Sequence, residues 1–212
     1  MGDNMESLAN GRFPSAELPL RLLKEAKTII ACDGAVKTLY EKGIHPDAIV
    51  GDLDSIPAGL RERYADRIHH VEDQEINDLT KSVRFAHTQG YREVLILGAT
   101  GLREDHTLGN ISLLMDYAHL FTQVEMLSDY GLFTPILKTT TFASYPGQQI
   151  SIFVLYPEGE ISTEGLRWPI RRRKLTSWWQ GTLNEALGDQ FTVTLSPDCR
   201  VIIYREASHT KE

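Results

Sequence analysis

Aspartate side chains recur in this sequence where an apolar run gives way to a polar stretch. Asp33 follows the apolar run 28–32, and Asp52 and Asp54 follow the run 47–50. Asp78 opens an amphipathic stretch at 78–88. If the runs are parallel strands, their carboxyl ends meet at one edge of a sheet, where α/β proteins bind ligands. The sequence therefore predicts a site at that edge.

The pattern Asp52-x-Asp54 indicates a divalent cation. Residues i and i+2 of an extended backbone face the same side, so we expect Asp52 and Asp54 to converge while Leu53 turns into the core. Carboxylates held together repel each other unless a cation lies between them. Mg²⁺ fits this role because it binds one or two protein carboxylates together with substrate phosphates and water.

The same loops carry groups that could bind phosphate. Their glycines would let backbone N–H groups approach an anion, and Lys81 and Arg103 are candidate phosphate clamps. These glycines are Gly34, Gly51, Gly98 and Gly101. A lone aspartate before a helix is most often an N-cap, and a lone glycine is often a turn residue. Agreement between separate loops is what favours a metal and phosphate site.

Alternating apolar runs and amphipathic stretches predict the elements that position these loops. Strands are expected at 28–32, 47–50, 67–71, 93–97 and 123–127, and helices at 34–42, 78–88 and around 108–118. This alternation implies right-handed crossovers and a mostly parallel sheet covered on both faces. After Tyr130, β-like segments at 133–137, 149–156, 191–195 and 201–204 predict a small antiparallel domain.

Composition narrows the class of protein. With 212 residues, 42% of them hydrophobic, the chain has room for one large domain or two small ones. A net charge of −7 argues against a nucleic-acid partner, and no apolar run approaches the roughly 20 residues of a membrane helix. Residues 1–5 lack the basic start of a secretory signal, and two cysteines are too few for a disulfide framework. We expect a cytoplasmic protein.

Five ordered segments of the chain resemble the motifs of the thiamine pyrophosphokinase family. They are ANGRFP at 9–14, CDGA at 32–35, PDAIVGDLDS at 46–55, DQEINDLTK at 73–81 and GLREDHTLGN at 101–110. The resemblance implies an α/β fold with two domains. An N-terminal Rossmann-like, mostly parallel sheet with helices on both faces would form the nucleotide- and metal-binding catalytic domain, 1–139. A C-terminal antiparallel β-sandwich, 140–212, would bind thiamine and form the dimer.

The resemblance also implies a reaction. Diphosphate would pass from ATP, the co-substrate, to the hydroxyl of thiamine with Mg²⁺ as the cofactor, giving thiamine diphosphate and AMP. Asp52, Asp54 and Asp78 would be the metal-binding and catalytic residues, with Asp54 and Asp78 as alternative acceptors of the hydroxyl proton. The residues matching nucleotide-site positions are Asn10, Asp33, Gln74, Asn77, Lys81, Thr100, Arg103 and Asp105.

The resemblance also implies a homodimer, with thiamine held between one subunit's α/β edge and its partner's β-sandwich. The C-terminal signature departs from the family pattern. GLRWP at 165–169 matches, but the later T-S-N-E-F element reads TLNEA, with Leu183 and Ala186 in place of the serine and the aromatic residue. Trp178 and Trp179 could supply a stacking face for thiamine, or they could be core or interface aromatics.

Two other functions share some of these features. Asp52-x-Asp54-Ser55 resembles the first motif of haloacid-dehalogenase-type phosphatases, but that family places it after the first strand and needs a later lysine and acidic pair. A non-catalytic thiamine- or nucleotide-binding protein is the second alternative. Intact aspartates in the metal loops argue against it, because a binder has no need to hold several carboxylates beside phosphates.

Overall fold

Short runs rich in isoleucine, valine and leucine form most strands of the first part of the chain. The computed structural model describes residues 5–8, 11–197 and 199–207, and the chain divides into two units, Met1–Asp129 and Tyr130–Glu212. The strands of the first unit are β1 (Met5–Leu8), β2 (Thr28–Cys32), β3 (Ala48–Gly51), β4 (Ile68–His70), β5 (Glu93–Leu97) and β6 (Gln123–Leu127).

The strands of the first unit pair in parallel in the order β6-β5-β1-β2-β3-β4. The sequence predicted every strand of this sheet except β1, which lies between β5 and β2. From β1 to β4 the chain adds strands on one side, and it then crosses to the other side of β1 to form β5. A crevice opens at such a reversal of strand order, at the carboxyl ends of the strands.

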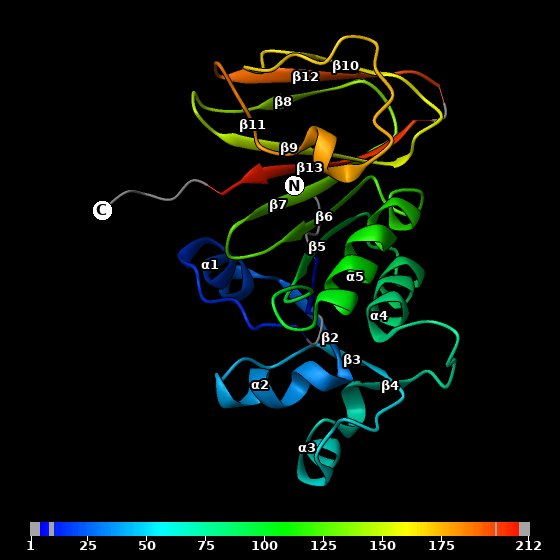
Figure 1. Cartoon of the computed structure of the whole chain (residues 1–212). Helices are drawn as coiled ribbons and strands as arrows, with labels where there is room; N and C mark the ends of the chain where they lie inside the picture. The colour runs from blue at the N-terminus through cyan, green and yellow to red at the C-terminus, as the bar shows by residue number, and fades with distance from the viewer. Residues whose placement is uncertain (1–4, 9–10, 198, 208–212) are drawn as a thin grey trace. The chain divides into compact units, whose positions relative to one another are not determined.

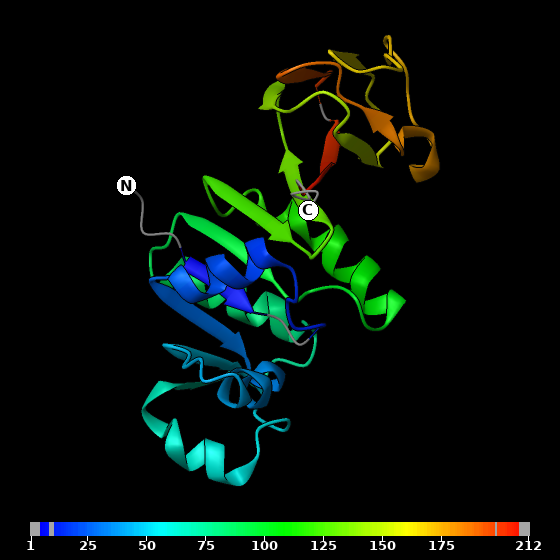
Figure 2. The ribbon, with the colours of Figure 1, turned by 90° about the vertical axis from the view of Figure 1, so that its left-hand side faces the viewer.

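Helices lie on both sides of this sheet. They are α1 (Glu17–Glu25), α2 (Val36–Glu41), α3 (Ala58–Arg63), α4 (Asp78–Thr88) and α5 (Glu104–Tyr117). Figure 1 shows α4 and α5 on one side of the strands and α1 on the other, and α1 lies in front of the strands in Figure 2. Helix α4 has the bounds that its periodicity predicted and buries Leu79, Val83 and Ala86.

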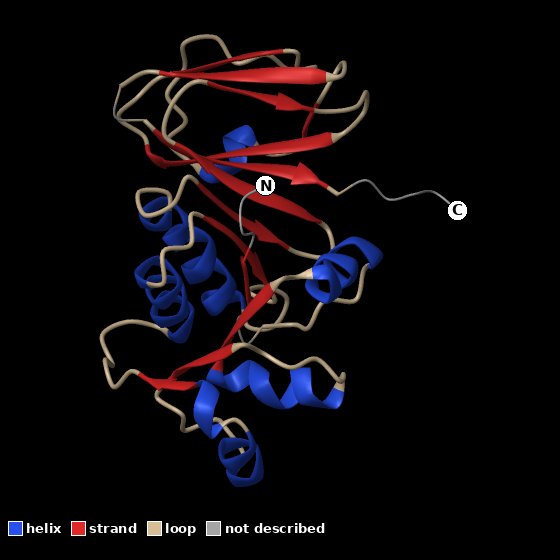
Figure 3. Ribbon diagram, turned by 180° about the vertical axis from the view of Figure 1, so that it is seen from behind, coloured by secondary structure: helices blue, strands red, loops and turns tan. Residues whose placement is uncertain are grey.

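The second unit consists of antiparallel strands with little helix, as Figure 3 shows. Its strands are β7 (Gly131–Ile136), β8 (Thr140–Ala143), β9 (Gln149–Tyr156), β10 (Ile161–Glu164), β11 (Asn184–Glu185), β12 (Gln190–Leu195) and β13 (Arg200–Glu206). They pair in the orders β11-β9-β13-β7 and β10-β12-β8. Because β7 belongs to this unit, the division lies before the boundary expected at 139/140.

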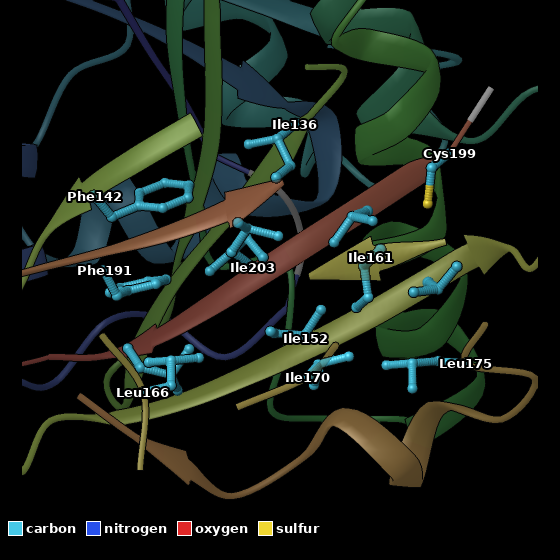
Figure 4. Close-up of a cluster of buried hydrophobic side chains, with 14 of the residues drawn as sticks. Ile136, Phe142, Ile152, Ile161, Leu166, Ile170, Leu175, Phe191, Cys199 and Ile203 are labelled. Atoms are coloured by element: carbon cyan, nitrogen blue, oxygen red, sulfur yellow. The ribbon is translucent and has the colours of Figure 1, made fainter. Parts of the chain in front are cut away.

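The core of the second unit lies between these strands. Alternate residues of β9 and β13 point inward, among them Ile152 and Ile203, and both are fully buried. Phe142 of β8 stacks on Phe191 of β12 with ring centroids 5.2 Å apart, and Figure 4 shows both rings facing this cluster. The fold is therefore mixed α/β, with a parallel sheet in the first unit and antiparallel sheets in the second. None of the described helices is long and apolar enough to cross a membrane.

Candidate active site

Three carboxylates meet beyond the carboxyl ends of β2, β3 and β4. Asp33 directly follows β2, Asp52 directly follows β3, and Asp78 begins α4 after the loop that leaves β4. One carboxylate oxygen from each lies within 4.8 Å of the others. We call Asp33, Asp52 and Asp78 the carboxylate cluster. The parallel sheet explains it, because neighbouring parallel strands end at the same edge.

Asp33 is the buried member of the cluster, with only 1% of its surface exposed. Its Oδ1 accepts a hydrogen bond from Gly34 N at 2.6 Å, and its Oδ2 accepts one from Leu53 N at 2.9 Å. Gly51 makes this packing possible, because an added Cβ would lie 2.6 Å from Asp33 Cγ. Burial raises the pKa of Asp33, and the nearby charge of Asp78 raises it further. Both effects disfavour the ionised form of Asp33, so its negative charge destabilises the site when no cation is bound.

Asp52 is held by donors from its own loop and from the next one. Its Oδ1 accepts a hydrogen bond from Asp54 N at 3.3 Å, and its Oδ2 accepts one from Gln74 Nε2 at 3.4 Å. These donors, with the positive charge of Lys81, hold the pKa of Asp52 below its ordinary value despite partial burial. Asp52 is therefore ionised at neutral pH.

Lys81 supplies a positive charge within the cluster. Its Nζ lies 2.9 Å from Asp78 Oδ1 and 3.7 Å from Asp52 Oδ2, and only 2% of its side chain is exposed. Burial would lower the pKa of Lys81, but the carboxylate neighbours outweigh burial and raise it. One ammonium against three carboxylates leaves a charge of −2. Carboxylate oxygens with that net charge fit a divalent cation such as Mg²⁺.

Asp54 does not join the carboxylate cluster. The expectation of an extended backbone from Asp52 to Asp54 is wrong, because Leu53 has φ +71° and turns the chain. Leu53 is buried as predicted, at 6% exposure, whereas Asp54 is exposed to solvent. Asp54 is therefore not one of the carboxylates that meet within 4.8 Å.

A pocket of about 330 Å³ adjoins the cluster within the first unit. Asp78 belongs to both the cluster and the pocket wall. The loops after β1 and β5 form the opposite part of the wall, joined by hydrogen bonds from Gly11 N to Gly98 O and from Arg12 N to Thr100 O, of 2.5 and 2.8 Å. The pocket therefore lies at the reversal of strand order, beside the acidic cluster.

Three of the eight predicted nucleotide residues line this pocket. Asn77, Thr100 and Arg103 are in its wall. Asp33, Gln74 and Lys81 lie in or beside the carboxylate cluster instead, and Asp105 pairs with Arg103. Arg103 is mostly exposed and donates two hydrogen bonds to Asp105, from Nε at 3.1 Å and from Nη2 at 2.5 Å. These bonds lower the pKa of Asp105 to about 2. Asn10 lies outside the described residues.

The sequence had not assigned the rest of the pocket wall to the nucleotide site. These residues are Gly11, Cys32, Leu79, Ala99, Leu102, His106, Thr107 and Asn110. His106, Thr107 and Asn110 follow Arg103 at spacings of three, four and seven residues, which places them on one face of α5. This helical spacing from Arg103 is visible in the sequence and could have indicated these three residues as part of the site. The side chain of Cys32 is buried and hydrogen-bonded to Ser82 at 3.3 Å.

A parallel α/β unit that gathers acidic groups and a pocket at the carboxyl ends of its strands is typical of enzymes that handle nucleotides and phosphate. Two family models match this chain: "Thiamin pyrophosphokinase, catalytic domain" over residues 20–126, and "Thiamin pyrophosphokinase, substrate-binding domain" over residues 131–204. The chain belongs to the thiamin pyrophosphokinase family.

Relatives with known names agree with this assignment. The chain is 29% identical over 174 residues to thiamine pyrophosphokinase 1 of Oryza sativa subsp. japonica, covering 74% of this chain and 64% of the rice protein. It is 31% identical over 120 residues to thiamin pyrophosphokinase 1 of Caenorhabditis elegans, covering 52% of this chain and 49% of that protein. The matched regions thus span about half to two thirds of these relatives.

Solved structures share the fold along almost the whole chain. The thiamin pyrophosphokinase of Candida albicans superposes with a TM-score of 0.81 at 18% identity, covering 98% of this chain and 90% of that one. The thiamine pyrophosphokinase of Bacillus subtilis superposes with a TM-score of 0.79 at 20% identity, covering 97% and 100%. At these identities the comparison concerns the fold alone.

Proposed function

We propose that this protein transfers diphosphate from ATP to the hydroxyl of thiamine in a Mg²⁺-dependent reaction that gives thiamine diphosphate and AMP. The observation that carries the proposal is the shared position of Asp78. It belongs to a cluster of three carboxylates within 4.8 Å and also lines the adjoining pocket. A cation at the cluster and a nucleotide in the pocket would therefore be neighbours. Membership of the family supplies the identity of the two substrates.

Asp52, Asp54 and Asp78 are our candidates for the metal site, with Asp33 assisting from its buried position. The carboxylate cluster fits Mg²⁺ because it offers carboxylate oxygens and a net charge of −2 when Lys81 is counted. When bound there, Mg²⁺ would neutralise phosphate charge and make the β-phosphorus more susceptible to attack. We infer that Asp54, which is exposed, completes the site from the solvent side once a cation is bound.

Asp54 is also our preferred acceptor for the proton of the thiamine hydroxyl. Asp78, the alternative, already accepts a hydrogen bond from Lys81 at 2.9 Å, so one of its carboxylate oxygens is engaged. Asp54 is exposed, and its backbone N–H is held by Asp52 at 3.3 Å. A carboxylate on a held backbone and open to solvent suits proton transfer to an incoming hydroxyl.

The nucleotide site that we propose comprises the pocket and its rim. We assign to it Asn10, Asp33, Gln74, Asn77, Lys81, Thr100, Arg103 and Asp105. The first turns of α4 and α5 face the pocket through Asp78 and Thr107, so the positive ends of two helix dipoles lie near it. We also assign the first unit to the Rossmann-like class, on its parallel strands and its reversal of strand order beside β1.

Thiamine binding is assigned to the second unit of a homodimer. A pocket of about 290 Å³ there is lined by Trp168, Leu183 and neighbouring residues. Large apolar side chains are exposed around it, with Trp179 at 74% and Leu183 at 72%. Such exposure suits both an aromatic substrate and a second copy of the chain. Sedimentation equilibrium at micromolar concentration should give twice the monomer mass of 23.9 kDa.

We expect the protein to act in the cytoplasm, where its two buried cysteines would remain as free thiols. The function itself is tested by incubating purified protein with ATP, Mg²⁺ and thiamine and separating the products. Formation of AMP and thiamine diphosphate in equal amounts supports the proposal. Inorganic phosphate without a thiamine product would indicate a phosphatase, and unchanged ATP would indicate a binding protein.

A further inference from the structure

A continuous chain of hydrogen bonds joins the core of α5 to the pocket wall through the first turn of α4. Tyr117 OH lies 2.7 Å from Thr80 Oγ1, and Thr80 Oγ1 donates to Asn77 Oδ1 at 2.8 Å. Asn77 Nδ2 donates to Asn110 Oδ1 at 3.1 Å, and Asn110 Nδ2 donates to Ala99 O at 2.9 Å. We call Tyr117, Thr80, Asn77 and Asn110 the α4–α5 relay.

Two backbone groups, Ala99 O and Thr80 N, fix the direction of every bond in the relay. The Ala99 carbonyl can only accept, so Asn110 must turn its NH₂ group to it and its oxygen to Asn77. Thr80 N donates to Asn77 Oδ1 at 2.9 Å, so the amide of Asn77 is oriented as well. Because the single hydroxyl proton of Thr80 is given to Asn77, Tyr117 must be the donor to Thr80.

Tyr117 is suited to be a permanent donor. It is 2% exposed, and Thr80 is 6% exposed, so water does not compete for their bond. Burial raises the pKa of the Tyr117 hydroxyl, which therefore keeps its proton. The relay thus has one stable arrangement of protons.

The relay holds the part of α4 that carries charge. Asn110 and Tyr117 are seven residues apart on α5, so two successive turns of one face reach α4. Their partners, Asn77 and Thr80, lie directly before and after the Asp78-Leu79 pair at the start of α4. Asp78 is the residue shared by the carboxylate cluster and the pocket. At its other end the relay reaches Ala99, which lines the same pocket.

We propose that Tyr117, Thr80, Asn77 and Asn110 position Asp78 relative to the nucleotide pocket, so that binding of the cation and of the nucleotide strengthen each other. This inference rests on the proposed function of the same site. Tyr117 and Thr80 act as positioning residues through Asn77 and Asn110. Asn77 is the residue that joins both sides, because its amide accepts from Thr80 and donates to Asn110. A threonine there could cap α4 but would have no amide with which to do both.

The test measures coupling in the full-length protein. Binding of α,β-methylene-ATP, whose α–β bridge cannot be cleaved, is titrated with and without Mn²⁺, and the ratio of the two dissociation constants gives the coupling. For Tyr117→Phe we expect the coupling to fall about tenfold, because Asp78 keeps its carboxylate but is no longer fixed relative to the pocket. Mn²⁺ binding without nucleotide should change little. In Asn77→Thr the coupling should fall by a similar factor. In the double variant of Tyr117→Phe and Asn77→Thr the coupling should fall no further than in either single variant.

Tyr64→Phe is the matched control. Tyr64 is 3% exposed, and its hydroxyl is 2.7 Å from His45 Nδ1, away from the carboxylate cluster. It should lose thermal stability as Tyr117→Phe does but keep the wild-type coupling. Wild-type coupling in Tyr117→Phe, or equal losses in both variants, would overturn the relay while leaving the proposed function intact. A wild-type protein with no coupling between Mn²⁺ and the nucleotide analogue would overturn the proposed function, and the relay with it.

Discussion

Lys81 donates a hydrogen bond to Asp78 across 2.9 Å, although only 2% of the lysine side chain is exposed. The same ammonium lies 3.7 Å from Asp52. A buried lysine persists in the charged state only where acidic partners offset the loss of hydration. The charge of Lys81 therefore depends on the carboxylate cluster. Lys81 neutralises only part of the negative charge of the cluster, and the remainder can be neutralised by a divalent cation.

Replacing Lys81 by methionine should destabilise the protein most when no divalent cation is present. The carboxylates would then repel each other without their only basic partner among the described ion pairs of the cluster. Asp52 and Asp78 are partly exposed, so we expect about 2 kcal/mol, between the values typical of surface and buried pairs. Urea unfolding in EDTA and in excess Mg²⁺ measures this, and Mg²⁺ should recover part of the loss.

Lys37→Met is the control for that experiment. Lys37 forms an exposed pair with Glu41 one helical turn away, at 4.0 Å. Its loss should cost about 0.5 kcal/mol or less, equally with and without Mg²⁺. A loss in Lys81→Met that is indifferent to Mg²⁺ would contradict a cation-binding role for the cluster.

Gly51→Ala should disturb Asp33. The added methyl would lie 2.6 Å from Asp33 Cγ and 2.9 Å from its Cβ, so the buried aspartate must shift. We expect a loss of about 1–3 kcal/mol in the free energy of unfolding, as for other overpacked sites. Mn²⁺ binding should weaken in parallel. Gly59→Ala, in α3 with open space around the new methyl, should leave Mn²⁺ binding unchanged and raise helix stability by up to about 1 kcal/mol. If the two variants had the same free energy of unfolding and the same Mn²⁺ affinity, Gly51 would not pack closely against Asp33.

Asp129 should make the stability of the first unit fall at acidic pH. Burial alone would raise the pKa of Asp129, but hydrogen bonds from Ala16 N and from Ser15 outweigh it and lower the pKa below 3.8. A carboxylate with a depressed pKa stabilises the fold above its unfolded-state pKa and loses this effect as the pH falls through its folded-state pKa. At neutral pH we expect the free energy of unfolding of the wild-type protein to exceed that of Asp129→Asn by about 1 kcal/mol. This difference should shrink below about pH 4. Chemical unfolding from pH 7 to pH 2 measures the difference, and a constant difference would refute the role of the charge.

Asp52→Asn and Asp54→Asn should fail in different ways. Asp52 belongs to the carboxylate cluster, so its amide variant should bind Mn²⁺ about tenfold or more weakly and lose turnover. Asp54 is exposed and outside the cluster. If it accepts the hydroxyl proton and only completes the metal site from the solvent side, Asp54→Asn should lower kcat about 100-fold or more while it weakens Mn²⁺ binding less than Asp52→Asn does. Equal weakening of Mn²⁺ binding by both variants would make Asp54 a ligand rather than the base.

Local pattern predicted some of these features and could not predict others. The bounds of β2, α4, β5 and β6 follow from apolar periodicity, and Asp78 begins α4 as that pattern predicted. Helix α1 was missed because Pro19 reads as a helix breaker, yet proline is tolerated in the first turn, where its missing N–H has no partner to lose. Short or weakly apolar elements such as β1 and α3 carried no comparable signal.

The site shows the same limit. That Asp33 and Asp52 share an edge follows from the order of strands and loops. The positive φ of Leu53, which separates Asp54 from them, arises where Leu53 N donates to Asp33, twenty residues away. The bond between Thr80 and Tyr117 likewise joins two helices that are separate in the sequence. Such contacts depend on tertiary packing, and no spacing within one segment encodes them.

The most direct test of the account follows one phosphorus atom. ATP labelled with ³²P at the β-position is incubated with protein, Mg²⁺ and thiamine, and the products are separated. Attack at the β-phosphorus predicts that the label appears in thiamine diphosphate, with unlabelled AMP formed in equal amount and with no labelled product in Asp52→Asn. Label retained in ADP, or released as inorganic phosphate, would contradict the transfer of diphosphate at this site.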